Sequence, residues 1–310
     1  MSIAVGIDEN GLGPQLGPLV VTAVTAKVTA QAEQRMTHDP TVFFHDRLAD
    51  SKKLVSHQKV QLAEAWARAI AGPAACPDAL LQHLCLDSQA VRHSLCPDSA
   101  LPQCWSPHDE AFQASENQVC LARNDLKDLR SLGVDVLDAR CVILCVRRLN
   151  DGRHRGVSRL DFDLQAMESL ILAIVQHTQQ PIDARCGKVG GMMRYPSKFT
   201  HLSGFPYGVL HEQRSESAYR LAGIGTIRFL QDAEEKDPLV SIASLVGKWV
   251  REMLMNRIVR FYRQHDDTLP DASGYHDPVT NAFVRNSQAL RQRLGIPQDC
   301  FLRQGKKDVC

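Results

Sequence analysis

The sequence predicts an α/β protein whose mixed sheet begins with an antiparallel hairpin, continues with parallel strands and is flanked by helices. Near the N-terminus, the apolar runs 3–7 and 19–24 are separated by a turn rich in Gly and Pro, which is typical of two buried strands joined as a hairpin. Further on, an amphipathic segment at 160–179 stands between two apolar runs. Strand, helix and strand in this order favour a crossover to a parallel neighbour.

A helix is expected after the hairpin. Ser51 can serve as its N-cap, and an apolar face continues to about residue 71, where Gly72-Pro73 ends it. The next stretch, 73 to about 130, differs in composition, because prolines and cysteines are frequent and the apolar runs are short. We interpret it as a Cys- and Pro-rich insertion of unassigned role in a single domain covering 1–310.

The second half of the chain is expected to alternate strands and helices. The segment 160–179 is the most regular predicted helix, and Asp161 or Asp163 is expected to cap it. The other expected elements are a strand at 133–137, a helix at 138–149, strands at 181–183 and 226–230, a long helix at 241–261 and a helix at 282–294. The C-terminal part, about 255–310, is thus expected to be helical, and it contains a basic run at 302–307.

Composition narrows the class of protein without identifying a partner. With 310 residues, 44% of them hydrophobic and 23% charged, the chain can bury a sizeable core. The net charge of +1 neither favours nor excludes nucleic acid, because a groove can be locally basic on a neutral protein. No apolar run is long enough to span a membrane and no leader pattern is present, so we expect a soluble, cytoplasmic protein with no membrane partner. The ten cysteines form no Cys-x-x-Cys pair and are expected to be free thiols, with a zinc site in the insertion as the alternative.

Two adjacent carboxylates stand at the end of the first predicted strand. Asp8 and Glu9 follow the apolar run directly, and buried carboxylates are costly to desolvate unless a cation lies between them. A third carboxylate, Asp183, ends a later predicted strand and would lie beside Asp8 if the two strands were parallel neighbours. Converging carboxylates suit Mg²⁺, and two such ions support phosphodiester hydrolysis. The alternative is that these residues only open solvated turns.

Two motifs resemble those of a known family. Gly-Ile-Asp-Glu-Asn-Gly-Leu-Gly-Pro-Gln-Leu-Gly-Pro-Leu-Val-Val, at 6–21, resembles the first motif of the type 2 ribonucleases H (ribonucleases HII and HIII), and Asp50-Ser51-Lys52-Lys53-Leu54 resembles the second. The resemblance covers 3–71 and about 133–308. It implies a ribonuclease H-like fold and an endoribonuclease that cleaves the RNA strand of RNA/DNA hybrids with two Mg²⁺ or Mn²⁺ ions, leaving 3′-hydroxyl and 5′-phosphate ends. Single ribonucleotides in DNA are a further implied substrate.

The resemblance also implies a set of catalytic metal ligands. Asp8, Glu9 and Asp183 match three of the family's carboxylates. Within the acidic stretch 232–237, Glu234 occupies the position where the family usually has Asp. Ribonuclease HIII enzymes have Glu there, and Asp232 is the alternative ligand.

Contacts to nucleic acid are implied at a Gly-Leu-Gly loop and at a tyrosine. The backbone amides of Gly11 and Gly13 can approach a ligand closely, whereas Leu12 stands where ribonuclease HII has Arg. Tyr275 matches a tyrosine that stacks on the sugar at the RNA–DNA junction in archaeal and eukaryotic ribonuclease HII. The other residues expected to contact nucleic acid are Lys52, Lys53, Lys188, Ser244 and Lys248.

Two alternative functions remain open from the sequence. The altered fourth ligand and the unusual Leu12 are also what we would expect of a hybrid-binding module that has lost catalysis. A junction resolvase of the same fold is disfavoured, because Lys52-Lys53 and Tyr275 match type 2 enzymes. Since Glu234 is HIII-like and Tyr275 is HII-like, the sequence does not separate the two subtypes.

Overall fold

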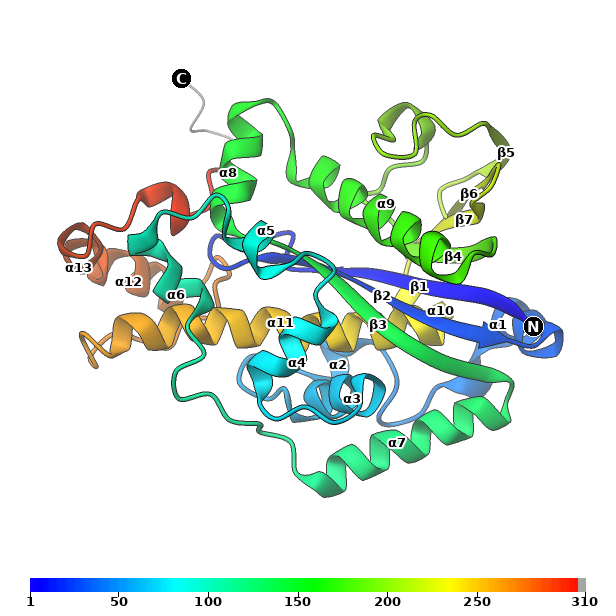
Figure 1. Cartoon of the computed structure of the whole chain (residues 1–310), viewed down its shortest axis with the longest axis horizontal. Helices are drawn as coiled ribbons and strands as arrows, with labels where there is room; N and C mark the ends of the chain where they lie inside the picture. The colour runs from blue at the N-terminus through cyan, green and yellow to red at the C-terminus, as the bar shows by residue number, and fades with distance from the viewer. Residues whose placement is uncertain (306–310) are drawn as a thin grey trace.

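A seven-stranded sheet forms the centre of the computed structural model, which describes residues 1–305 (Figure 1). β1 (Ser2–Asn10) pairs antiparallel with β2 (Leu19–Val28), and β2 pairs antiparallel with β3 (Val134–Leu144). On the other side of β1, β4 (Ile182–Gly187) runs parallel to it, and β7 (Gly225–Leu230) runs parallel to β4. This order confirms the predicted mixed sheet, in which the antiparallel hairpin precedes parallel strands.

Two further strands extend the sheet beyond β7. β5 (Tyr207–Glu212) and β6 (Glu216–Leu221) pair antiparallel with each other, and β6 pairs antiparallel with β7. The sequence analysis did not predict them. β5 is an edge strand that is exposed over most of its length, so it has no buried apolar face from which a strand could be recognised.

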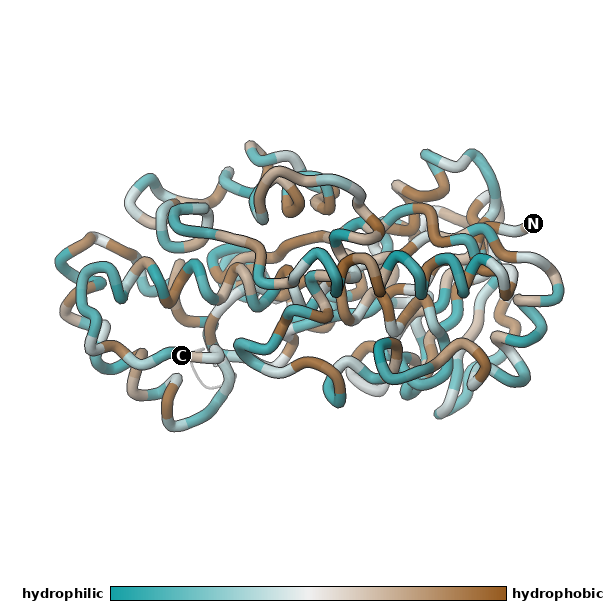
Figure 2. Tube along the Cα trace, turned by 90° about the horizontal axis from the view of Figure 1, so that it is seen from below, coloured by the Kyte–Doolittle hydropathy of each residue, from teal (hydrophilic) through white to brown (hydrophobic). Residues whose placement is uncertain are grey.

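The α-helices are distributed over the whole chain. They are α1 (Ala30–His38), α2 (Ser51–Leu54), α3 (Gln61–Ala71), α4 (Pro77–Leu84), α5 (Gln89–His93), α6 (Leu101–Trp105), α7 (Glu116–Ser131), α8 (Val146–His154), α9 (Arg159–Thr178), α10 (Ala233–Lys236), α11 (Pro238–Arg263), α12 (Pro278–Asn286) and α13 (Gln288–Arg293). Hydrophobic and hydrophilic residues alternate in short stretches along them (Figure 2), as expected for helices that bury one face. None of the described helices is long and apolar enough to cross a membrane.

The two longest helices cover opposite faces of the sheet: α9 one face and α11 the other (Figure 1). The side chains of β1 alternate between them. Val5 and Ile7 belong to the apolar cluster that includes α9, and Ala4 belongs to the cluster that includes α11. Gly6 faces α11 at close range, because a Cβ added there would lie 2.2 Å from the carbonyl carbon of Leu239. The sequence of β1 therefore sets both layers of the core.

Three predicted elements were wrong in part. The helix expected over 51–71 is two helices, α2 and α3, because the intervening residues leave helical geometry and Gln58 has a φ of 66°. The helix expected over 138–149 is mostly strand, since β3 continues to Leu144 by pairing with β2. The helix expected over 282–294 is divided between α12 and α13.

The N-terminus of α9 also differs from the prediction. Ser158 is the N-cap: its hydroxyl accepts from the Asp161 N–H, and the Asp161 carboxylate accepts from the Ser158 N–H at 2.9 Å. Asp161 is therefore the reciprocal partner of the cap. Asp163 lies inside the helix on its buried face.

The segment between 73 and 130 is largely helical. Leu80, Leu81 and Leu84 of α4 and Val119 and Leu129 of α7 are buried in the same apolar cluster as α3 and α11. The segment thus packs onto the α11 side of the sheet. The nine cysteines within the described residues are all free.

Candidate active site

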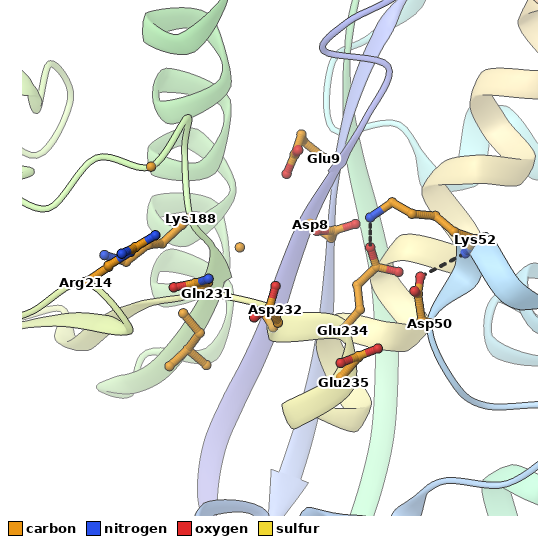
Figure 3. Close-up of a pocket in the computed structure, with 14 residues that line it drawn as sticks. Asp8, Glu9, Asp50, Lys52, Lys188, Arg214, Gln231, Asp232, Glu234 and Glu235 are labelled. Carbon is orange, nitrogen blue, oxygen red and sulfur yellow. Dashed lines mark hydrogen bonds and ion pairs between the residues drawn. The ribbon is translucent and has the colours of Figure 1, made fainter.

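A cleft of about 490 Å³ lies where β1 and β4 end and α10 begins (Figure 3). It combines several carboxylates with three cationic side chains. The charged residues that line it are Asp8, Glu9, Asp50, Lys52, Lys188, Arg214, Asp232, Glu234 and Glu235. Such a mixture can bind a cation and a phosphate group at the same place.

Asp8 is the most deeply buried carboxylate of the cleft. Its side chain is on the α11 side of β1, it is 5% exposed, and its Oδ2 has no hydrogen-bond partner among residues 1–305. Burial raises the pKa of Asp8 well above its ordinary value, and repulsion from Glu9 and Glu234 adds to this, while a hydrogen bond from Ser244 opposes it. A bound cation would offset both the cost of burying the carboxylate charge and its repulsion from the neighbouring carboxylates.

Glu9 belongs to the same group of interacting charges. Burial, followed by repulsion from the carboxylate of Asp163, raises the pKa of Glu9 to about 8. In Figure 3 the side chains of Asp8 and Glu9 leave β1 in different directions, as expected for consecutive residues of a strand. The end of β1 therefore presents one carboxylate toward each layer of helices.

Glu234 approaches Asp8 from α10. Its Oε2 accepts from the backbone N–H of Ser51 at 3.0 Å, and its Oε1 pairs with the Nζ of Lys52 at 3.3 Å. These contacts join α10 to α2. The acidic motif at 232–237 and the motif at 50–54, both identified in the sequence, are therefore in contact here. Asp232, the alternative ligand, also lines the cleft and has a φ of 55°.

Asp183 is not brought to this group, which corrects the prediction. In the pairing of β4 with β1, Asp183 lies opposite Ala4. It is four residues before Gly187, where β4 ends at the cleft, which is about 13 Å along the strand. Its carboxylate pairs with Arg185 and Arg228, each at 3.1 Å. The strand predicted at 181–183 continues to Gly187, so Asp183 stands near its beginning.

Gly187 is the residue of β4 that faces the carboxylates. The parallel register pairs Ile7 with Cys186, and Gly187 follows beside Asp8. A Cβ added at Gly187 would lie 3.1 Å from the Oδ1 of Asp8 and 3.5 Å from the Oε2 of Glu9. The position from which β4 could provide a third carboxylate thus carries no side chain.

Asp163 is a buried carboxylate that the sequence analysis assigned only as a possible helix cap. It is fully buried, and neither carboxylate oxygen has a hydrogen-bond partner among residues 1–305. Burial, followed by repulsion from Asp8, raises the pKa of Asp163 well above its ordinary value. The sequence did contain a sign of this burial, because Asp163 has helical spacing with Met167 and Leu170 and so lies on the apolar face of α9.

The Gly-Leu-Gly loop and Tyr275 do lie side by side. The backbone N–H groups of Gln15 and Leu16 donate to the carbonyl of Gly274 at 2.9 and 3.1 Å. Tyr275 is 47% exposed, and the guanidinium of Arg251 lies 4.6 Å from its ring centre.

The three loop residues themselves differ in exposure. Gly11 is buried with a φ of 92°, and its carbonyl accepts a hydrogen bond from the Arg303 guanidinium. Leu12 is partly buried against the apolar cluster on the α9 side of the sheet, whereas Gly13 is exposed. Arg303, from the predicted basic run, is thus a buried support for the loop. Lys306 and Lys307 of that run lie outside the described residues.

Ser244 and Lys248 face α2, where they brace its backbone. Ser244 is 1% exposed, and its hydroxyl lies 3.0 Å from that of Ser51. The Nζ of Lys248 donates to the carbonyls of Val55 at 2.5 Å and Ser51 at 3.3 Å. Both residues therefore hold α2 beside the cleft, and their contact with nucleic acid stays a prediction.

The remaining predicted lysines differ in position. Lys52 lines the cleft with a side chain that is 78% exposed. The Nζ of Lys53 forms an ion pair with the Oε1 of Glu235 at 2.8 Å. Lys188 also lines the cleft, and its Nζ donates to the carbonyl of Gln213 at 2.8 Å.

The donor set of the cleft suits a hard divalent cation. Asp8, Glu9 and Glu234 offer carboxylate oxygens, and an oxygen of Asp8 is buried without a partner in the described chain. As the side chains stand, residues 1–305 hold no group of three or more His, Cys, Asp or Glu side chains placed around one ion position. Glu234 is instead engaged by Ser51 and Lys52.

Comparison with solved structures finds ribonuclease H chains. Ribonuclease HII from Archaeoglobus fulgidus, in a PCNA complex, is 14% identical; the match covers 99% of this chain and 96% of that chain, with a TM-score of 0.42. Ribonuclease H2 from Pyrococcus horikoshii OT3 is 15% identical, with 96% of this chain and 92% of that chain covered and a TM-score of 0.46. Bst-RNase HIII in complex with Mn²⁺ is 13% identical, with 97% of this chain and 66% of that chain covered and a TM-score of 0.45. No family model and no curated protein sequence matches the chain. At these low identities and TM-scores, we base the functional proposal on the chain's own residues.

Proposed function

We propose that this protein is a metal-dependent endoribonuclease that cleaves the RNA strand of RNA/DNA hybrids. The observation that carries the proposal is the buried carboxylate of Asp8 at the end of the central strand, with the half-buried Glu9 next to it, Glu234 nearby and an open cleft in front. A carboxylate as buried as Asp8 is costly unless a cation is bound, and motifs 6–21 and 50–54 resemble those of type 2 ribonucleases H.

Asp8, Glu9 and Glu234 would hold the Mg²⁺ or Mn²⁺ ions, with Asp232 as the alternative to Glu234. When bound, two such ions supply an activated water and neutralise charge on the departing 3′-oxygen. Lys52 is placed to offset phosphate charge, because its ammonium group is exposed and lies at the mouth of the cleft. The products would carry 3′-hydroxyl and 5′-phosphate ends.

The loop at 11–13 and Tyr275 would contact the substrate next to the cleft. The loop follows β1 directly, so the groups that would contact the sugar are fixed relative to Asp8. Distinguishing RNA from DNA requires polar groups near the 2′-hydroxyl, and exposed peptide groups around Gly13 can provide them. Lys188 and Arg214, on the opposite side of the cleft, would attract the phosphate backbone.

The second candidate is a hybrid-binding module without catalysis. It is favoured by one observation, the absence of a side chain at Gly187 beside Asp8. Purified protein should be incubated with two labelled duplexes, one with a long RNA strand on DNA and one with a single ribonucleotide in DNA, each with Mg²⁺ and with Mn²⁺. Cleavage of either duplex supports the enzyme, whereas hybrid binding without metal-dependent cleavage supports the module.

A further inference from the structure

The segment 188–231 carries a surplus of positive charge. It runs from the residue after β4 to the residue after β7, and it includes β5 and β6. Six lysines and arginines stand in it against two glutamates, which gives a net charge of +4 on a chain whose net charge is +1. The rest of the chain is therefore acidic on balance. Positive charge concentrated in this way indicates an anionic partner for the segment.

The protein does not neutralise this surplus by its own ion pairs. Both glutamates are already paired, Glu212 with Arg194 at 3.5 Å and Glu216 with Arg228 at 3.2 Å. The four other cationic side chains form no ion pair within residues 1–305, and all but the first are exposed; they are Lys188, Lys198, Arg214 and Arg220.

Two of these four cations stand at the cleft. Lys188 and Arg214 line it on the side opposite Glu234 (Figure 3). The Nζ of Lys188 donates to the carbonyl of Gln213 at 2.8 Å, which holds the turn between β5 and β6 against the end of β4. The hairpin of β5 and β6 thus has its turn at the cleft and extends away from it along the sheet.

Arg220 lies further along this hairpin, on the same face of the sheet as Asp8. It is opposite Thr226 of β7. Thr226 is opposite Asp183 of β4, which is opposite Ala4 of β1. Paired residues point to the same face and alternate residues of a strand share it, so Arg220 lies on the α11 side with Ala4 and Asp8. β6 begins at the cleft four residues earlier, about 13 Å away, over which a duplex advances about four base pairs.

The acidic side chains of this part of the face are engaged in ion pairs. Asp183 and Glu216 each pair with Arg228, at 3.1 and 3.2 Å. Arg220 is exposed, and so is the residue opposite it in β5. The hairpin therefore presents two positive charges that no described carboxylate pairs with, Arg214 at the turn and Arg220 further along β6. Such a spacing is complementary to the phosphate backbone of a nucleic acid.

We propose that the hairpin of β5 and β6 is a nucleic-acid-binding surface that holds a duplex where it extends beyond the cleft. Arg214 and Arg220 contact phosphates through their guanidinium groups, so the contact does not depend on base sequence. The inference rests on the proposed function, because the duplex is the RNA/DNA hybrid whose RNA strand enters the cleft. It adds two residues and a surface that the sequence analysis did not assign.

The test measures hybrid binding by fluorescence anisotropy in EDTA, which prevents metal-dependent cleavage. The full chain is titrated against a labelled RNA/DNA hybrid at several salt concentrations. Each phosphate contact adds about 0.9 to the steepness with which log affinity falls with log salt. Arg220→Gln should therefore reduce that steepness by about one and weaken binding about eightfold at about 0.1 M salt. Arg220→Lys keeps the charge and should keep the salt dependence of the wild type.

Lys198→Gln is the matched control. It removes one charge from the same segment, but Lys198 lies beside α9, since the N–H groups of Thr200 and Leu202 donate to Glu168. Its affinity and salt dependence should equal those of the wild type.

Wild-type binding by Arg220→Gln, or equal losses in Arg220→Gln and Lys198→Gln, would overturn the inference and leave the proposed function intact. Absence of hybrid binding by the wild type would also overturn the inference. If cleavage with Mg²⁺ and with Mn²⁺ is absent as well, the proposed function is overturned too. If Arg220→Gln does not fold, Arg220→Thr, which suits a strand, is measured against the same control.

Discussion

Gly187 of β4 stands directly beside Asp8 of β1, so close that an added Cβ would lie 3.1 Å from the Oδ1 of Asp8. The two strands are parallel neighbours in the middle of the sheet, and both end at the cleft. The sheet therefore contributes carboxylates from β1 alone. The other acidic residues that line the cleft lie outside the strands: Asp50 and Asp232 directly before α2 and α10, and Glu234 and Glu235 within α10.

Asp8→Asn is expected to abolish metal-dependent cleavage and to leave folding intact. Asn has the same shape but carries no charge, so the residue no longer has to be ionised in a buried site. At pH 7 the melting temperature of the metal-free variant should therefore equal or exceed that of the wild type. Cleavage of a labelled RNA/DNA hybrid and thermal denaturation check the two parts. Retained cleavage in a folded variant would contradict the role given to Asp8.

Lys52→Ala should reduce hybrid cleavage more strongly than Lys53→Ala. Lys52 lines the cleft beside Glu234, whereas Lys53, which pairs with Glu235, does not line it. Both lysines are exposed, so both variants should keep the stability of the wild type within about 0.5 kcal/mol. The measurement is kcat/KM on one hybrid under one salt condition. Equal losses in the two variants would indicate only a general effect of charge.

Tyr275→Ala should impair cleavage at a single ribonucleotide in DNA more than cleavage of a long hybrid. The ring is exposed beside the Gly-Leu-Gly loop and Arg251 lies over it, so its loss removes a stacking surface without opening the core. Tyr275→Phe keeps the ring and serves as the control. Parallel assays on the two duplexes give the ratio of rates. An unchanged ratio in Tyr275→Ala would exclude a role at the junction.

The stability of the protein should fall as pH rises from about 6.5 to about 9 through the titration of His57. The carboxylates of Asp271 and Glu252 raise its pKa from 6.5 to about 9 in the folded protein, and its Nδ1 lies 2.7 Å from Glu252. Between these values the folded state binds a proton that the unfolded state has released, so the free energy of unfolding decreases with pH. Below pH 6.5 this contribution is fully present.

Urea unfolding at several pH values measures this dependence. His57→Gln cannot titrate and should show a flatter profile across the same interval, with the rest of the pH dependence unchanged. Because His57 joins the residues between α2 and α3 to Glu252 of α11, the loss of stability at high pH should also loosen α2 beside the cleft. A wild-type profile in His57→Gln would show that other groups cause the slope.

Local sequence was sufficient for the elements whose signals are local. The buried run before Asp8-Glu9, the turn after it and the amphipathic pattern of α9 and α11 each depend on neighbours a few residues away. For the same reason the acidic motif around Glu234 and the basic motif around Lys52 could be identified before their contact was known. β5 escaped prediction because it has no buried face.

The tertiary structure alone decided which carboxylates meet. Shifting β4 by four residues against β1 would exchange Asp183 for Gly187 at the cleft, and nothing in the local sequence specifies that register. The burial of Asp163 likewise depends on where the first turn of α9 lies relative to two strand ends. The local sequence by itself predicted a site rich in carboxylates after the first strand. Long-range packing decided which residues belong to that site, because strand register and helix placement are properties of the whole core.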